Sequence, residues 1–276
     1  MSSLKVALIG CGSIGTVLAK AIDAGKAGEA ELIWLYDLNP EKSEALAKKL
    51  RSKPGVAKNV AEIYVDDATN LIIEAASQKA VAQYALDVLR SGKDLMVMSV
   101  GAFSDEKLLS SVRKISERSG RKVYVPSGAV LGIDGVKAAM FDEIEEAILT
   151  TRKPPATLAY SAYLQKRGID LTGLKEPLVV FEGLAREAVR AFPESVNVAA
   201  TLSLAGIGFD KTNVRIIADP SLGRNVHEIR VRGEAGEFIT EARNLPSPEN
   251  PRTSYLAALS AIRALRNLTE AIRIGT

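Results

Sequence analysis

The stretch Leu4-Lys5-Val6-Ala7-Leu8-Ile9-Gly10-Cys11-Gly12-Ser13-Ile14-Gly15 decides the fold class of this chain. Its first six residues form an apolar run of strand length, and the apolar positions after the last glycine recur with helical spacing. A G-x-G-x-x-G motif between a strand and a helix predicts a dinucleotide-binding βαβ unit. Gly10 would allow the tight turn, Gly12 would leave room for a pyrophosphate, and Gly15 would let the helix lie close to the strand.

The start of the predicted helix adds a physical reason for phosphate binding. Its free N–H groups and the positive end of the helix dipole favour an anion. We therefore expect the cofactor to contact Gly10, Gly12, Ser13, Ile14 and Gly15. The alternative is a glycine-rich turn in an ordinary α/β domain.

Asp37 supplies a second cofactor signal. The run Glu31–Tyr36 has the composition of a second strand, and Asp37 follows it, 22 residues after Gly15. An acidic side chain at this position accepts hydrogen bonds from the adenosine ribose and repels the extra phosphate of NADP. Because no arginine adjoins Asp37, we expect NAD as the cofactor, and because Lys42 is near in sequence, NADP is also possible.

Composition narrows the class of protein. The chain has 276 residues with 47% hydrophobic and 25% charged residues, as in ordinary globular proteins. A net charge of only +3 argues against nucleic acid or an anionic membrane as the main partner. The single cysteine, Cys11, permits no intrachain disulfide, and the sequence begins without a signal-peptide layout. We expect a cytoplasmic protein with no metal site.

The first half alternates strands and helices. Further apolar runs at Leu71–Ala76, Asp94–Val100 and Lys122–Val125 read as strands, and helices are expected over 41–50, 78–90 and 105–119, the last capped by Ser104. This alternation predicts an α/β fold with an N-terminal Rossmann doubly wound parallel sheet. We place this dinucleotide-binding domain at residues 1–126.

The second half has a different pattern, which predicts a strand-rich α+β domain at residues 127–245. Helices are expected only near Arg186–Phe192 and Ser195–Gly206. The expected strands are Ala147–Arg152, Thr157–Leu164, Leu178–Glu182, Val214–Ala218, Asn225–Arg232 and Phe238–Ala242. Residues 246–276 then form a proline-rich loop and a long amphipathic helix, capped by Thr253 or Ser254, which we expect to return to the first domain.

Two loops and one lysine are weaker candidates. Ser77-Gln78 and Ser99–Ala102 follow predicted strands at the carboxyl edge of the sheet, where ligands of such sheets bind, although both can equally be tight turns. Lys137 lies three residues after Asp134, so it either forms a solvated ion pair or holds a substrate carboxylate.

His227 is the candidate for the chemistry, since it is the only histidine in the chain. Strand alternation directs it to the same face as Ile229 and Val231, inward, while charged neighbours face outward. Imidazole titrates near neutral pH, which suits a general acid or base in a hydride-transfer reaction. Asn197 is a second candidate, because its amide can pair with a nicotinamide carboxamide or ribose, or can merely cap a helix.

Several stretches together resemble the L-aspartate dehydrogenase family. They are Gly10–Gly15, Pro126–Ala129, Phe192-Pro193 with Asn197–Ala200, Ala218–Pro220 with Asn225–Ile229, and Asn250–Tyr255. The resemblance implies NAD(P)-dependent oxidation of L-aspartate to iminosuccinate, which yields oxaloacetate and ammonia, and the reverse reductive amination, with a link to NAD biosynthesis. It also implies a catalytic role for His227, cofactor contacts at Ala129 and Asn197, and a homodimer or larger oligomer.

The alternatives are a related two-domain reductase and a protein that senses NAD(H) without turnover. A reductase for homoserine, a 2-oxo acid or a dihydropicolinate-like ring would rely on a lysine such as Lys137. The two substrate carboxylates need cationic partners, for which Lys137 and Arg252 are candidates.

Overall fold

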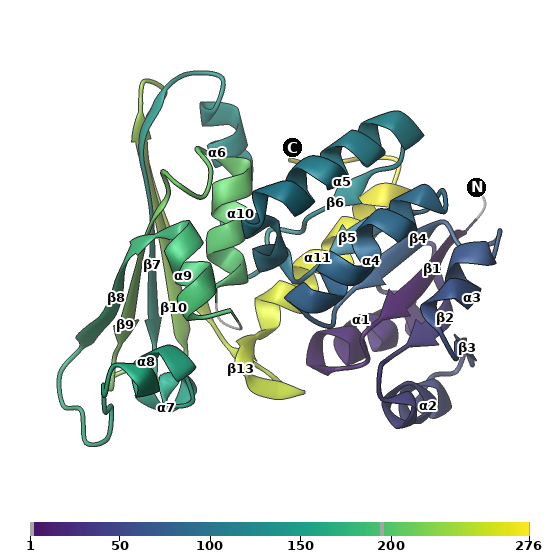
Figure 1. Cartoon of the computed structure of the whole chain (residues 1–276), viewed down its shortest axis with the longest axis horizontal. Helices are drawn as coiled ribbons and strands as arrows, with labels where there is room; N and C mark the ends of the chain where they lie inside the picture. The colour runs from purple at the N-terminus through teal and green to yellow at the C-terminus, as the bar shows by residue number, and fades with distance from the viewer. Residues whose placement is uncertain (1–2, 194–195, 276) are drawn as a thin grey trace. The chain divides into compact units, whose positions relative to one another are not determined.

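The chain divides into two compact units, which Figure 1 shows within the whole chain. The computed structural model describes residues 3–193 and 196–275, with the backbone alone for residues 251 and 252. One unit comprises Met1–Pro126 together with Ala258–Ile274, and the other comprises Ser127–Ala257 with the last two residues. The first unit is therefore built from two separate segments of the sequence.

The first unit contains a six-stranded sheet whose paired strands are all parallel. Its strand order is β3-β2-β1-β4-β5-β6, the order of a Rossmann fold. The central strands are buried on both faces, which explains their continuous apolar runs. The strands are β1 (Leu4–Ile9), β2 (Ala30–Tyr36), β3 (Gly55–Val56), β4 (Leu71–Glu74), β5 (Asp94–Val97) and β6 (Val123–Tyr124).

Helices of the first unit begin at polar caps. Asn39, Asn59, Ser77 and Asp105 each accept a backbone N–H of the helix that follows. Asp105 thus takes the capping role that the sequence assigned to Ser104, which belongs to the short 3₁₀ helix Val100–Ser104. The helices are α1 (Ser13–Asp23), α2 (Pro40–Lys49), α3 (Val60–Val65), α4 (Gln78–Arg90) and α5 (Glu106–Ser119).

The C-terminal helix α11 (Tyr255–Thr269) packs on the first unit, as its amphipathic pattern predicted. Ala261 and Leu265 are fully buried within the same hydrophobic core as Val6, Leu8 and Leu18. Each Å² of apolar surface removed from water stabilises the fold by about 25 cal/mol. The buried face of this helix therefore contributes to the stability of the Rossmann core.

The second unit contains a five-stranded mixed sheet of order β11-β10-β7-β9-β8. Its buried face is covered by α6 (Ile133–Ala139), α9 (Ala185–Ala191) and α10 (Asn197–Ala205) (Figure 1). The strands are β7 (Ile144–Lys153), β8 (Leu178–Leu184), β9 (Asn213–Ala218), β10 (Asn225–Gly233) and β11 (Gly236–Asn244), with β12 (Pro246–Ser247) and β13 (Asn250–Ser254) forming a separate pair. Together the two units confirm the predicted fold class.

The strand expected at Thr157–Leu164 is wrong. Two short helices, α7 (Pro155–Leu158) and α8 (Ala162–Lys166), occupy this stretch. Pro155 has a fixed φ suited to the first helical turn and has no N–H to offer a strand ladder. Thr157 closes the turn, since both its N–H and its hydroxyl donate to the carbonyl of Pro154.

In the part of the chain that the structure describes, no helix combines the length and the apolar character needed to cross a membrane.

Candidate active site

The glycine-rich loop of the first unit has the geometry that its sequence predicted. Gly10 has φ of +100°, and a Cβ there would lie 2.7 Å from the backbone of Ala75. A Cβ on Gly15 would lie 1.9 Å from the Gly10 carbonyl oxygen, so helix and loop approach too closely for any side chain. A Cβ on Gly12, by contrast, would meet nothing within 4 Å. The loop therefore keeps open space at the start of α1.

The beginning of α1 fits a bound phosphate group. Its N-cap, Gly12, provides no side-chain hydrogen bond, and no acidic residue lies in the first turn. The hydroxyl of Ser13 is buried and has no hydrogen-bond partner among the described residues. Helix N–H groups without a capping side chain attract an anion, so these residues fit the pyrophosphate of a dinucleotide.

Asp37 lies beside the glycine-rich loop, at the end of β2. One carboxylate oxygen accepts the backbone N–H of Cys11 at 2.8 Å, and the other accepts the N–H of Asn39 at 2.9 Å. Burial raises the pKa of the Cys11 thiol to about 12, and the charge of Asp37 adds to this effect. Cys11 is therefore an uncharged packing residue, and the carboxylate of Asp37 holds the turn between β1 and α1.

The two candidate loops at the carboxyl ends of β4 and β5 are joined by one buried carboxylate. Glu74 is 2% exposed and accepts the backbone N–H groups of Ala76, Ser77 and Ser99, at 2.8 to 3.0 Å, as well as the Ser99 hydroxyl at 2.8 Å. Burial raises the pKa of Glu74 above its usual range, while these hydrogen bonds act in the opposite direction. The sequence identified the two loops but not the residue that fixes them together.

His227, in the second unit, is buried on the helix-covered face of its sheet. It is 4% exposed and shares this face with Ile229 and Val231, as strand alternation predicted. Its neighbour across the sheet is Thr151 of β7, whose hydroxyl oxygen lies 3.0 Å from Nδ1 of the ring. This hydrogen bond engages Nδ1 and fixes the ring orientation, so Nε2 is the ring nitrogen outside this contact.

Lys153 is a site residue that sequence reasoning missed. It lies two positions after Thr151 on β7, so both side chains project from the same face of the sheet. It is 5% exposed, and burial lowers its pKa to about 8. Burial, and then the charge of Lys153, lower the pKa of His227 to about 3. At neutral pH the site therefore holds a lysine ammonium beside an uncharged imidazole.

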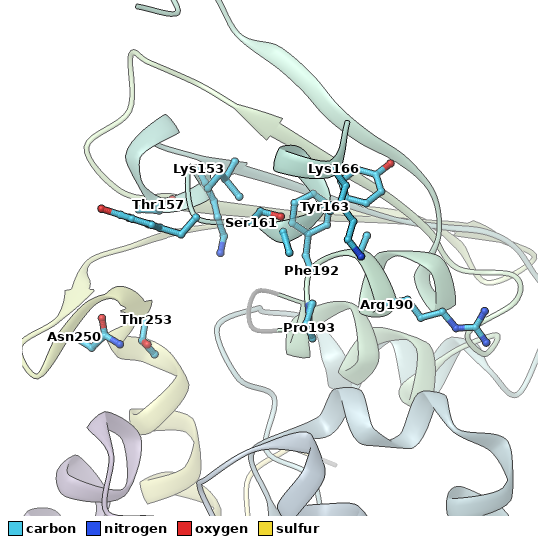
Figure 2. Close-up of a pocket in the computed structure, with 14 residues that line it drawn as sticks. Lys153, Thr157, Ser161, Tyr163, Lys166, Arg190, Phe192, Pro193, Asn250 and Thr253 are labelled. Atoms are coloured by element: carbon cyan, nitrogen blue, oxygen red, sulfur yellow. The ribbon is translucent and has the colours of Figure 1, made fainter. Parts of the chain in front are cut away.

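A cavity of about 480 Å³ opens beside Lys153, and all of its lining residues belong to the second unit. Figure 2 shows the Lys153 ammonium directed into this space, with Asn250 and Thr253 of β13 on another side. The aromatic rings of Tyr163 and Phe192 pack together in the wall, with centroids 5.0 Å apart. The size is that of a small-molecule site.

The cavity is basic. Besides Lys153, its lining includes Lys166 and Arg190, and none of its lining residues is acidic. Hydroxyl and amide groups of Thr157, Ser161, Thr253 and Asn250 add hydrogen-bonding capacity. Cations together with neutral polar groups suit an anionic ligand rather than a cation.

Ala129 and Asn197 come from two segments that lie near each other in the second unit. A Cβ built on Gly128 would lie 3.8 Å from Val198, so the segment before Ala129 runs beside the first turn of α10, where Asn197 is the first residue. Ala129 is buried, and its carbonyl accepts the side-chain amide of Asn244 at 3.0 Å. Both remain predicted cofactor contacts.

The other carboxylate-binding candidates are not placed in the cavity. Lys137 is exposed on α6 and is not part of the cavity lining. The side chain of Arg252 lies outside the part of the chain that the structure describes. Within the described residues, no group of three or more histidine, cysteine, aspartate or glutamate side chains is arranged to hold a metal ion.

Comparison with known proteins relates both halves of the chain to dehydrogenases. Residues 10–126 match the NAD-binding domain of homoserine dehydrogenase, and residues 134–268 match the C-terminal domain of aspartate dehydrogenase. The L-aspartate dehydrogenase of Methanosarcina mazei is 49% identical over 274 residues, which cover 99% of this chain and 100% of the relative. That of Nitrosopumilus maritimus is 41% identical over 99% of both chains. The crystal structure of aspartate dehydrogenase from Thermotoga maritima superposes with a TM-score of 0.78 at 29% identity, covering 99% of each chain.

Proposed function

Because the chain belongs to the L-aspartate dehydrogenase family, we propose that it oxidises L-aspartate to iminosuccinate with NAD, and also catalyses the reverse reductive amination. The observation that carries this proposal is the 49% identity to an L-aspartate dehydrogenase over 99% of the chain. The strand of His227 and the residues of the basic cavity lie within the part that matches the C-terminal domain of aspartate dehydrogenase. Iminosuccinate then reacts with water to give oxaloacetate and ammonia.

The first unit is an NAD-binding domain, and NAD when bound supplies the acceptor for the hydride that leaves C2 of the substrate. The open space at Gly12 and the first turn of α1 hold the pyrophosphate in this proposal. The paired loops joined by Glu74 lie at the carboxyl edge of the same sheet, where such sheets bind their ligands.

His227 moves the protons. Oxidation removes a hydride from C2 and a proton from the amine, and hydration of the imine then removes a proton from the attacking water. In the tautomer whose Nδ1–H donates to the Thr151 hydroxyl, Nε2 carries a lone pair and accepts the proton of that water. In the reverse direction, the same nitrogen returns the proton to the leaving hydroxyl group.

Asp37 sets a preference for NAD over NADP in this proposal. Its carboxylate closes the turn at the adenosine end of the predicted site, where a negative charge repels a ribose phosphate. The positive charge of Lys42 acts on the same loop, since it lowers the pKa of Cys11 against the larger effects of burial and Asp37. This charge would attract the extra phosphate of NADP, so the preference for NAD is not absolute in this proposal.

We propose further that the enzyme is a homo-oligomer in the cytoplasm and that its iminosuccinate enters NAD biosynthesis. The family resemblance supports these points, and a single buried cysteine fits a reducing compartment. Light scattering of the purified protein measures the subunit number directly.

Absorbance at 340 nm with NAD and L-aspartate tests the activity. We expect NADH production by the wild type and a loss of about 10²-fold to 10⁴-fold in kcat for His227→Ala, the range of general acid–base catalysis. Thr151→Val should cause a smaller loss, since it removes only the group that orients the ring.

Two outcomes would reject parts of this proposal. No signal in either direction, with oxaloacetate, ammonia and NADH as the reverse substrates, would show that aspartate is the wrong substrate. Full activity in His227→Ala would leave the substrate in place but remove His227 from the mechanism.

A further inference from the structure

We propose that Lys153 binds a carboxylate of the substrate in the cavity, and that this contact is what allows the neighbouring His227 to take up a proton. The proposal rests on the proposed function, since it concerns how that site recognises an acidic amino acid. It assigns to Lys153 the role that the sequence offered to Lys137 and Arg252.

The position of Lys153 is the first argument. A buried ammonium requires a counter-charge, because removing it from water is costly. Lys153 is 5% exposed, yet among the described residues it forms no ion pair. The neighbouring pair runs from Arg152, which projects from the opposite face of β7, to Asp219, with a distance of 3.6 Å between Nη1 and Oδ2. A carboxylate of a ligand in the cavity that Lys153 lines would supply this counter-charge.

The surroundings of His227 are the second argument. On its own face of the sheet, His227 lies opposite the hydroxyl of Thr151 on β7 and two positions after Asn225 on β10. Asn244 of β11 lies opposite Asn225. None of these three side chains carries a charge. On β10 itself, Glu228 projects from the opposite face. Lys153 is the charged group that acts on the ring, and it disfavours a second positive charge.

The coupling between the two side chains follows from these charges. The Lys153 ammonium, together with burial, holds the pKa of His227 far below its ordinary value of 6.5. A carboxylate bound to Lys153 cancels the repulsion, so the pKa of His227 must rise on binding. The imidazole thus becomes an effective base only after an anionic substrate has entered.

This arrangement also produces selectivity. A substrate that lacks the carboxylate in contact with Lys153 loses a charge-assisted hydrogen bond and leaves the lysine buried without a counter-ion. It also fails to raise the basicity of His227. Both binding and proton transfer therefore discriminate against neutral analogues, in the same direction.

The single histidine makes a direct test possible. Tag-free protein labelled with ¹⁵N-histidine, saturated with NAD, gives imidazole signals from His227 alone. Succinate is the probe, since it has two carboxylates but no amine to oxidise. Titrations between pH 5 and 9 are compared with and without succinate for the wild type, Lys153→Met and Lys166→Met.

We expect the wild-type imidazole to stay uncharged down to pH 5 without succinate, and to begin protonating above pH 5 when succinate is bound. In Lys153→Met, succinate should bind at least tenfold more weakly and should leave the titration of His227 unchanged. Lys166→Met removes a positive charge from an exposed part of the same wall and should keep the succinate-dependent shift. Methionine preserves the volume of the buried chain, and the dispersion of the NMR spectrum reports whether each variant is folded.

The proposal is overturned if Lys153→Met binds succinate as tightly as the wild type, or if Lys166→Met loses the shift to the same extent. Steady-state kinetics separate this result from the proposed function. If the wild type oxidises L-aspartate and Lys153→Met keeps its KM for L-aspartate, the inference about Lys153 fails alone. If no aspartate is oxidised but the succinate-dependent shift is present, the anion site stands and the substrate assignment fails.

Discussion

At the scale of single residues, the sequence identified His227 but not its partner. One histidine in 276 residues, on a strand with clear alternation, is easily singled out. Lys153 is one of 36 basic residues, and its sequence neighbourhood gives no sign that it is buried. The cavity beside Lys153 is lined by residues of α7, α8 and β13. The sequence did not predict the structure or the position of these segments.

Lys153 should make the stability of the protein depend on alkaline pH. Its pKa is about 8 in the folded protein against 10.5 ordinarily, so the unfolded chain binds more protons between these values, and stability rises with pH through this window. The gain relative to Lys153→Met is at most about 3 kcal/mol. Urea unfolding of both proteins at pH 7.5, 8.5, 9.5 and 10.2 measures it. A stability difference that stays constant with pH would contradict the prediction.

Asp37 has two roles that one substitution can separate. Asp37→Asn keeps an oxygen to accept the Cys11 N–H but removes the charge. We expect the ratio of kcat/KM for NADP to that for NAD to rise about tenfold or more, corresponding to about 1.4 kcal/mol less repulsion. Asp37→Ala serves as the comparison, because it removes the tether as well and should also weaken NAD binding. Equal losses for both cofactors in Asp37→Asn would limit Asp37 to a structural role.

At the scale of elements, the Rossmann strands and their helices were predictable because each carries a local signal. The run Leu71–Ala76 is apolar enough to read as a strand, and Ser77 is a recognisable cap. The stretch Thr157–Leu164 was wrongly predicted as a strand, because the preceding Pro154-Pro155 pair, which favours the first turn of a helix, was not taken into account. The role of Glu74 was not predicted either. Its carboxylate accepts the N–H of Ser99 in the loop after the next strand, and the sequence near Glu74 gives no sign of this contact.

Glu74 should be essential to the carboxyl edge of the first sheet. Glu74→Ala leaves the N–H groups of Ala76, Ser77 and Ser99 without their acceptor, so we expect a loss of about 3 kcal/mol or more in the free energy of unfolding. The KM for NAD should rise too, as the two loops separate. Glu44→Ala, at an exposed position on α2, should change stability by no more than about 0.5 kcal/mol. An unchanged KM for NAD in a destabilised Glu74→Ala would show that the loops do not contact the cofactor.

At the scale of the whole molecule, the sequence predicted a Rossmann sheet, a second α+β unit and a returning C-terminal helix. Alternation of element types carries that information over long stretches, which is why the architecture was recoverable. The division into residues 1–126, 127–245 and 246–276 stays a prediction for the domain organisation. The cavity could not be predicted, because its wall combines residues from three separate stretches of the second unit, 153–166, 190–193 and 250–253.

The returning helix should matter to the NAD-binding unit rather than to the second one. Leu265→Ala removes a fully buried side chain from the Rossmann core and should cost about 2 to 5 kcal/mol. Leu259→Ala, on the same helix but 38% exposed, should cost much less. Calorimetry distinguishes the units, since the transition that NAD shifts upward belongs to the first. Equal effects of the two substitutions would contradict the packing of α11.

Because the first unit is built from two distant segments of the sequence, it cannot be completed until the end of synthesis on the ribosome. Its Rossmann sheet is complete once residue 126 has been synthesised, but its last core residues arrive only after residue 258. At about 5 to 20 residues per second, the ribosome needs roughly 7 to 26 s to add the intervening chain. During this time the surface that Ala261 and Leu265 later cover is bare, so a nascent chain stalled before α11 should be a substrate for chaperones.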